Sequence, residues 1–391
     1  MSIDGIAALV FVVFLGIFLW HKRHKVELQK ALFPILYVVM YRSSFGLKSM
    51  DKLAKKFPRV LKMAADISII LGFIGMILIG AQMVWNTVDV FTNAEGVPGI
   101  QPVLPIEAKG VFFVPFVYWI LSIFLLALFH EFAHGVIARA YNIPVKSSGF
   151  AFLCLILPII PAAFVEPDEK IIQKRPYRQQ LGIFAAGPIA NMLFAAVMFG
   201  MFFLISPVLS AAFDSQGVEL VKVSADSPAF AAGLHENDII VELNNIPITT
   251  VENMTKILNV SHPGDQLSIQ TTNNSFIVTL GANPKNDSKA FLGIQTRNYL
   301  VTKAEFVSKY GAWLPPALKW ITGLIFWLFM LNIGIGLFNL LPIGPLDGGR
   351  MFQLVCFKLF KKKATAIRIW GLVSVFFVIL ILANMVLGFL R

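Results

Sequence analysis

Charged side chains are scarce in this chain of 391 residues, making up 14% of it, whereas apolar residues make up 57%. Typical globular domains carry about 25% charged residues, so the composition excludes an ordinary water-soluble protein. Cysteine is also rare, and two cysteines exclude a framework of several disulfides. The net charge of +11 does not indicate a nucleic-acid partner, because in so apolar a chain Lys and Arg mark the loops that stay in the cytoplasm.

Long apolar runs account for this composition. Each run is close to the roughly 20 residues that a helix needs to cross about 30 Å of hydrocarbon. The first run ends in a basic cluster without a small-residue cleavage site, which indicates a retained anchor. The sequence therefore predicts a polytopic α-helical membrane protein with about six transmembrane helices, at 4–20, 66–86, 112–140, 181–206, 317–342 and 367–390.

The basic residues alternate between loops. Segments 21–65, 141–180 and 343–366 are rich in Lys and Arg, whereas the loop 87–111 holds only Lys109. Because basic loops stay inside, these three segments are expected in the cytoplasm and both chain ends outside. The predicted location is the cell membrane of a prokaryote.

The stretch 207–316 is polar, and the alternation of loops places it outside. Its strand-like runs at 218–223, 238–243, 266–270 and 276–280 are separated by turn sequences rich in Asn, Gly and Pro. The run from Ser227 to Leu234, followed by a strand, resembles the PDZ family. We expect a small extracytoplasmic, β-rich, PDZ-like domain at 210–299. It would either bind the C-terminus of a peptide or exclude substrates with bulky ectodomains.

The third span carries the sequence His130-Glu131-Phe132-Ala133-His134. Residues four apart share one face of a helix at about 6 Å of rise, so both imidazoles can bind one metal. The intervening Glu can then serve as a general base toward water. Roughly 0.003 such motifs are expected by chance at this composition. The alternative, in which these side chains only satisfy one another, is disfavoured because ionisable groups within a span cost about 2.5–3.5 kcal/mol.

A catalytic zinc ion needs a third protein ligand and one position left for water. Asp347 closes a run of Pro and Gly, 338–349, that cannot continue a helix. Broken backbone at membrane depth is tolerated only where it is buried in protein or lines a watery cavity. Asp347 is therefore the predicted third ligand. The alternative is an ordinary helix end at which Asp347 caps the next helix.

Three signatures in order resemble the site-2 protease family of intramembrane metalloproteases. They cover roughly 112–350 and are His130-Glu131-Phe132-Ala133-His134, then Gly187-Pro188-Ile189-Ala190-Asn191, then Asn339-Leu340-Leu341-Pro342 leading to Leu346-Asp347-Gly348. The resemblance implies one zinc ion per active site, with Glu131 as the catalytic base. The implied metal ligands are His130, His134 and Asp347. Asn191 and Asn339 would hold the substrate or support the transition state. Alternatively, Asn191 makes only a packing hydrogen bond.

Segment 148–165 is apolar and contains two prolines. It resembles the family's re-entrant β-hairpin, whose free edge could hold unwound substrate by strand addition. The alternative is a loop in the membrane interface. The expected organisation is a two-span accessory region with a basic loop (1–111), the first half of the catalytic core (112–206), the PDZ-like domain (210–299), the helix carrying the Asp ligand (317–350), and a basic loop with the last span (351–391).

The predicted function is that of a zinc endopeptidase that cleaves the transmembrane segments of other membrane proteins, using zinc-activated water and Glu131 as base. The expected partners are membrane proteins with a transmembrane helix and the lipid bilayer, with no nucleic acid. Two alternatives remain. A divalent-cation transporter explains the metal ligands but not the position of Glu131 between them. An inactive scaffold presenting the PDZ-like domain predicts no metal.

Overall fold

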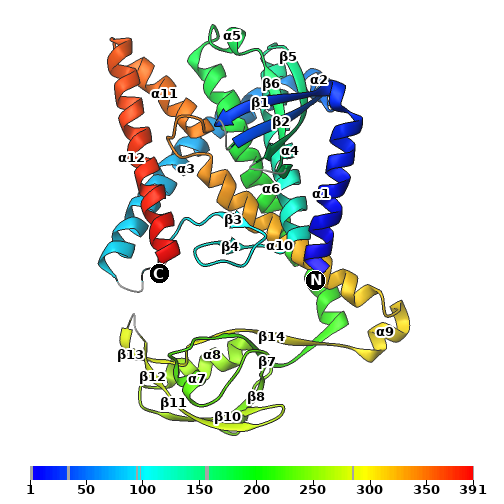
Figure 1. Ribbon diagram of the computed structural model, residues 1–391, viewed down its shortest axis with the longest axis vertical. Helices are drawn as coiled ribbons and strands as arrows, with labels where there is room; N and C mark the ends of the chain where they lie inside the picture. The colour runs from blue at the N-terminus through cyan, green and yellow to red at the C-terminus, as the bar shows by residue number, and fades with distance from the viewer. Residues whose placement is uncertain are drawn as a thin grey trace. The chain divides into compact units, whose positions relative to one another are not determined.

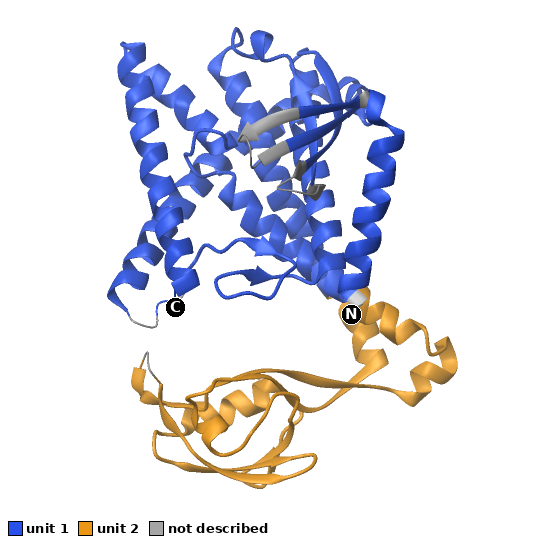
Figure 2. Cartoon of the chain, viewed as in Figure 1, with its two compact units in different colours: residues 1–202, 322–391 blue, residues 203–321 orange. Residues whose placement is uncertain are grey.

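The computed structural model describes residues 3–390, except 33–35, 94–95, 97, 155–157 and 284–285. The chain divides into two compact units (Figure 2). Unit 1 contains residues 1–202 and 322–391, and unit 2, residues 203–321, is inserted between them in the sequence.

Six helices among the described residues are long and apolar enough to cross a membrane, which confirms the number predicted. They are α1 Ile3–His21, α3 Pro58–Thr92, α4 Phe116–Ala140, α6 Tyr177–Ala212, α10 Leu314–Phe338 and α12 Lys363–Leu390. Most boundaries differ from the prediction by one to eight residues, and two of these differences have a local reason in proline. Helix α3 begins well before residue 66, at Pro58, because proline is favoured at the first helical position. Helix α10 ends at Phe338, ahead of Pro342, which cannot continue it.

A four-stranded antiparallel sheet lies at one end of unit 1 (Figure 1). Its order is β1-β2-β5-β6, from strands β1 Val26–Leu32, β2 Leu36–Ser43, β5 Val145–Cys154 and β6 Pro158–Pro167. Strands β5 and β6 pair antiparallel, with Ser148 opposite Val165. They contain the described residues of 148–165, the segment expected as a hairpin or an interfacial loop. Residues 155–157 of it lie outside the described part of the chain, and its re-entrant position stays a prediction. Strands β1 and β2 were not predicted, because 21–65 was interpreted by its charge alone.

Short helices complete this end of unit 1. They are the 3-10 helix η1 Arg23–Lys25, α2 Leu47–Lys56, α5 Glu169–Ile172 and α11 Asp347–Leu359. Helix α2 is amphipathic and buries Met50 and Ala54. Helix α11 occupies residues that were expected to form a basic loop, and it is helical because Met351 and Leu354 form a buried stripe at helical spacing.

Both chain ends of unit 1 lie at the opposite end of its helices, beside the short parallel pair β3 Val103–Leu104 and β4 Phe112–Phe113 (Figure 1). The basic segments 21–65, 141–180 and 343–366 therefore lie at the same end of unit 1 (Figure 1). Segments on one side of a membrane must be arranged in this way. Which side is cytoplasmic stays a prediction.

Unit 2 is a β-rich domain. Its sheet has the order β11-β10-β8-β7-β14, with β9 paired to β8, and β12 pairs with β13 separately. The elements are β7 Phe213–Val223, α7 Pro228–Ala231, β8 Ile239–Leu243, β9 Ile246–Pro247, α8 Val251–Val260, β10 Gln266–Thr271, β11 Ser275–Thr279, β12 Gly281–Asn283, β13 Asn286–Phe291, β14 Ile294–Thr302 and α9 Ala304–Tyr310.

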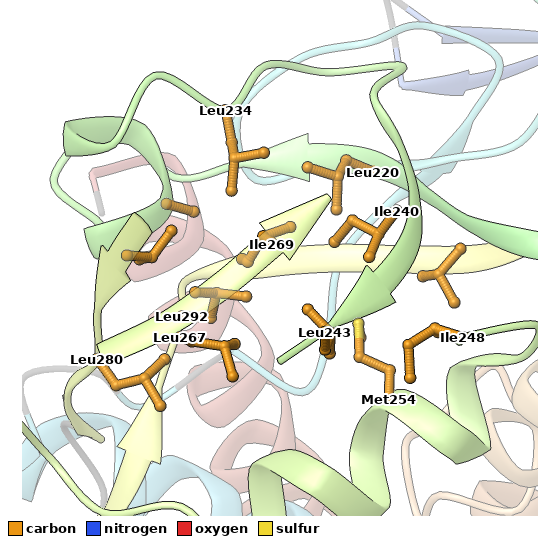
Figure 3. Close-up of a cluster of buried hydrophobic side chains, with 13 residues drawn as sticks. Leu220, Leu234, Ile240, Leu243, Ile248, Met254, Leu267, Ile269, Leu280 and Leu292 are labelled. Carbon is orange, nitrogen blue, oxygen red and sulfur yellow. The ribbon is translucent and has the colours of Figure 1, made fainter. Parts of the chain in front are cut away.

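One apolar core holds this domain together (Figure 3). Strand β10 alternates strictly, burying Leu267 and Ile269 and exposing the residues between them. This alternation is what fixes the register of a strand with one buried face. On the sheet, Arg297 of β14 donates to both carboxylate oxygens of Glu219 on β7, at 2.6 and 2.8 Å. The Arg297 guanidinium holds the pKa of Glu219 below its usual value.

Candidate metal centre

Helix α4 carries two imidazoles on one face. His130 and His134 are both buried, and their Nε2 atoms lie 3.1 Å apart. Glu131, between them in sequence, is half-buried. Its Oε2 accepts a hydrogen bond of 3.1 Å from the backbone N–H of Val165 on β6. The helix thus presents two nitrogen donors and, beside them, a carboxylate oriented by the neighbouring strand.

Helix α6 packs along this pair with residues at four-residue spacing. The Ile183 carbonyl accepts from His134 Nδ1 at 2.6 Å, and the Asn191 amide lies 3.1 Å from His130 Nδ1. Between them, a Cβ at Gly187 would lie 2.3 Å from His134 Nε2 and 2.6 Å from His130 Nε2. Only glycine fits there. The Gly-Pro-x-x-Asn signature therefore has a local physical reason, which sequence inspection alone did not reveal.

The turn after α10 brings Asp347 to the same place. A Cβ at Gly348 would lie 2.1 Å from the Leu340 carbonyl oxygen, and one at Gly349 would lie 1.9 Å from that of Ile343. These are backbone atoms, so only glycines allow α11 to begin directly against the turn. The Pro- and Gly-rich run is thus a close chain reversal.

Asp347 is the first residue of α11, and its carboxylate faces the imidazoles. Its Oδ2 lies 3.0 Å from His130 Nε2 and 3.4 Å from His134 Nε2. The N-cap position is held by Leu346, so Asp347 is not the cap that the alternative interpretation required. The three predicted ligands therefore converge, although His130 and Asp347 are 217 residues apart in sequence.

The donor set fits a zinc ion. Tetrahedral ligands at about 2.0–2.1 Å from zinc lie roughly 3.3 Å from one another, and the three donor atoms here are 3.0–3.4 Å apart. Because His134 Nδ1 donates to the Ile183 carbonyl, its Nε2 keeps a lone pair for a metal. Two imidazoles and one carboxylate are the ligand set of catalytic zinc sites, whereas structural zinc sites are closed by four protein ligands.

The environment of Asn191 supports the same conclusion. Its side chain is 0% exposed, and its Oδ1 has no hydrogen-bond partner in the described part of the chain. Rotating the amide by half a turn would place Oδ1 against His130 Nδ1, where it accepts the ring proton. His130 Nε2 would then carry a lone pair toward the other donors. The rotation thus pairs the buried oxygen and gives His130 the tautomer that a metal ligand needs.

A polar cavity of about 660 Å³ opens beside the donors. His130, Glu131, His134 and Asp347 line it together with Asn339, whereas Asn191 is not among the lining residues. Its mouth carries charged side chains of both signs, among them Lys146, Glu166, Glu169, Lys170 and Arg350. Water and a polar peptide backbone can therefore reach the donor atoms.

One ionic network beside this cavity was missed by sequence reasoning. Arg42 of β2 donates to Glu166 of β6, to Ser147 of β5 and to Glu27 of β1. It ties the N-terminal strands to the hairpin. The signal was absent from the sequence because the pairing of β2 with β5 joins segments about a hundred residues apart.

Comparisons with known proteins agree with these observations. An uncharacterized protein of Methanocaldococcus jannaschii is 28% identical over 87% of this chain and 82% of its own. A membrane-bound transcription factor site-2 protease homolog of Arabidopsis thaliana is 27% identical, over 50% of this chain and 37% of its own length. The zinc metalloprotease RasP of Shouchella clausii is 25% identical, over 50% of this chain and 57% of its own. This chain thus matches only part of the last two relatives.

Among solved structures, the PDZ domain of the SdrC-like protein from Listeria innocua is similar at 25% identity. The match covers 21% of this chain and 96% of that domain, with a TM-score of 0.19. The model of Peptidase family M50 matches residues 118–383, about two thirds of the chain, and spans all three predicted signatures. The resemblance to site-2 proteases is thereby confirmed, and the chain belongs to peptidase family M50.

Proposed function

We propose that this protein is an intramembrane zinc endopeptidase that cleaves the transmembrane helix of another membrane protein. One observation carries the proposal. Two imidazoles from one long apolar helix and a carboxylate from a distant turn converge beside Glu131, in a cavity that polar groups can enter. Membership of family M50 supports the metalloprotease class. The transporter alternative gives no role to a carboxylate held beside the donor set.

The proposed metal ligands are His130, His134 and Asp347. A zinc ion held by them would supply Lewis acidity for water and for the scissile carbonyl. Glu131 accepts the proton of the attacking water and returns it to the leaving amine. The hydrogen bond from Val165 restrains the Glu131 carboxylate beside the donors, so the base is oriented before substrate arrives.

The two asparagines take different roles in this proposal. Asn339 lines the cavity, where its amide is available to the substrate backbone. Asn191 is fully buried against His130, so we assign it a positioning role: it fixes the ring and its tautomer instead of contacting substrate.

The substrate helix must unwind locally, because its carbonyls are otherwise occupied by its own hydrogen bonds. The outer edge of β6 pairs with no strand among the described residues, and β6 lies against α4. The Val165 N–H points from this edge toward Glu131. An unwound segment added along β6 would therefore pass beside the base.

The charge alternation supports an inner-leaflet site facing the cytoplasm, in a multi-pass protein of the cell membrane. We further propose that the β-rich domain between α6 and α10 lies outside the cell. By its resemblance to PDZ domains, it would bind a peptide C-terminus or act as a size filter.

The decisive test is cleavage of a reporter membrane helix by Glu131→Gln, with Glu169→Gln as the matched control at the mouth of the same cavity. Loss of a general base costs about 10²–10⁴ in rate, so Glu131→Gln should lose at least a hundredfold and Glu169→Gln little. Metal analysis should find zinc in both variants, and a chelator should stop the wild type. Unchanged cleavage by Glu131→Gln would rule out the proposed mechanism.

A further inference from the structure

A second cavity lies on the other side of Glu131. It measures about 270 Å³ and is lined by five phenylalanines, one from the turn before α2 and four from α4, β5 and β6: Phe45, Phe129, Phe132, Phe150 and Phe164. Glu131 and Val165 line both this phenylalanine pocket and the polar cavity beside the metal ligands. The hydrogen bond between these two residues therefore stands at the division between a polar and an apolar space.

We propose that the phenylalanine pocket is a subsite that selects a bulky apolar side chain of the substrate, at a residue flanking the scissile bond. The inference rests on the proposed function and deepens it by naming a determinant of substrate choice.

The position of the pocket supports this role. A strand lying along β6 directs successive side chains to opposite faces. The pocket is formed by Ala163, Phe164 and Val165 of β6 on one side and by α4 on the other. A substrate backbone that reaches the donor atoms past Val165 thus has a neighbouring side chain within reach of the pocket.

The size and chemistry of the pocket define what it accepts. At roughly 30 Å³ per water, 270 Å³ is the space of about nine water molecules, enough for one large side chain. Of its hydroxyls, that of Ser148 is already used, since it donates to the Phe45 carbonyl oxygen at 2.5 Å. Leu, Met or Phe would fill the pocket, whereas Gly would leave it empty. A carboxylate would be buried beside the Glu131 carboxylate with no cationic side chain among the lining residues, at a large cost.

One wall of the pocket comes from the N-terminal part of the chain. Phe45, Gly46, Ser49 and Met50 precede residues 118–383, the region that matches the family model. Gly46 has φ +79°, a conformation that favours glycine, and it forms the turn into α2. Met50 is 2% exposed and anchors α2 in place. Selectivity would thus depend on an element outside the matched region.

The test uses the full chain and reporter membrane helices that differ only at the two residues flanking the mapped cut, with Leu, Phe, Ala or Asp at each. For one of the two positions, replacing Leu by Ala should lower kcat/KM by about 10–200-fold. Ser49→Phe fills the pocket, and Ser44→Phe is the matched control, an exposed serine of the same segment that does not line it. Ser49→Phe should abolish the preference for Leu over Ala, and Ser44→Phe should keep it.

Two results of the cleavage assay would overturn the inference. One is equal cleavage of the Leu and Ala reporters at both positions. The other is a fall in kcat/KM that Ser49→Phe shows equally with all reporters. A second measurement does not need activity: p-benzoylphenylalanine at Phe45, in a Glu131→Gln background, should crosslink to the residues flanking the cut. Crosslinking to a reporter that the wild type does not cleave would refute the protease and leave only a pocket that binds an apolar side chain. Crosslinks only to residues distant from the mapped cut would refute the subsite while leaving the protease intact.

Discussion

Replacing Gly187 by alanine tests the arrangement of the metal ligands without substituting any of them. The added Cβ would lie 2.3 Å from His134 Nε2 and 2.6 Å from His130 Nε2, whereas ordinary van der Waals contact begins at 3.4 Å. The imidazoles or the helix must therefore move by about 1 Å. Metal ligands tolerate errors of about 0.2 Å, so at least one donor should be lost.

The expected effect on zinc affinity is large. Loss of a supporting partner of a zinc ligand alone costs about 10–100-fold, and a displaced donor should cost no less. The intrinsic helix propensity of this position should not fall, because alanine is favoured over glycine in a helix by about 1 kcal/mol. The variant should thus remain folded while its zinc dissociation constant rises at least about tenfold.

Competition with a chromogenic chelator measures that constant on purified protein. Gly200→Ala is the matched control, since it makes the same change on the same helix and its Cβ would meet nothing within 4 Å. It should bind zinc like the wild type. If Gly187→Ala also bound zinc with unchanged affinity, the assignment of His130 and His134 as joint ligands would be refuted.

Three further predictions concern the supports of the fold and site. Asn191→Leu keeps the branched shape and the number of side-chain heavy atoms but removes the polar contact to the imidazole. Its zinc dissociation constant, measured by the same competition, should rise about 10–100-fold, and an unchanged constant would exclude a positioning role. A chelator should lower the melting temperature of the wild type but not of His134→Ala, because a ligand that binds only the folded state stabilises it; equal shifts would argue against a bound metal. The pKa of Glu219 is lowered by Arg297, so this pair should stabilise unit 2 at neutral pH, and the contribution should fade as the pH drops through the lowered pKa. The melting temperature of Glu219→Gln should therefore fall less at acid pH than that of the wild type. Identical dependence of the two melting temperatures on pH would contradict this prediction.

Much of the membrane architecture followed from the sequence because its signals are local. An apolar run longer than about 18 residues predicts a span wherever it folds, and the four-residue spacing of His130 and His134 predicts a shared helical face. Asp347 could be proposed because few acidic residues lie at a plausible depth. These inferences need no knowledge of how the helices pack.

What the sequence did not reveal depends on packing between distant segments. Strand β2 pairs with β5 across about a hundred residues, and its apolar pattern was hidden within a basic loop. The carbonyl of Ile183 has no sequence signal, because every residue carries one. The contribution of Gly187 emerges only from the close approach of α6 to α4.

The chain reversal at Asp347 also has a consequence for engineering. A cation shared by α4 and α11, as proposed above, would act as a cross-link that closes a very long loop, within which the whole of unit 2 is contained. Loop-closure entropy grows only with the logarithm of length, about 0.6 kcal/mol for each doubling. Excising unit 2, or exchanging it for an unrelated module of matched end spacing, should therefore barely alter the free energy of closing the cross-link, so the insert is free to diversify while the chemistry stays fixed.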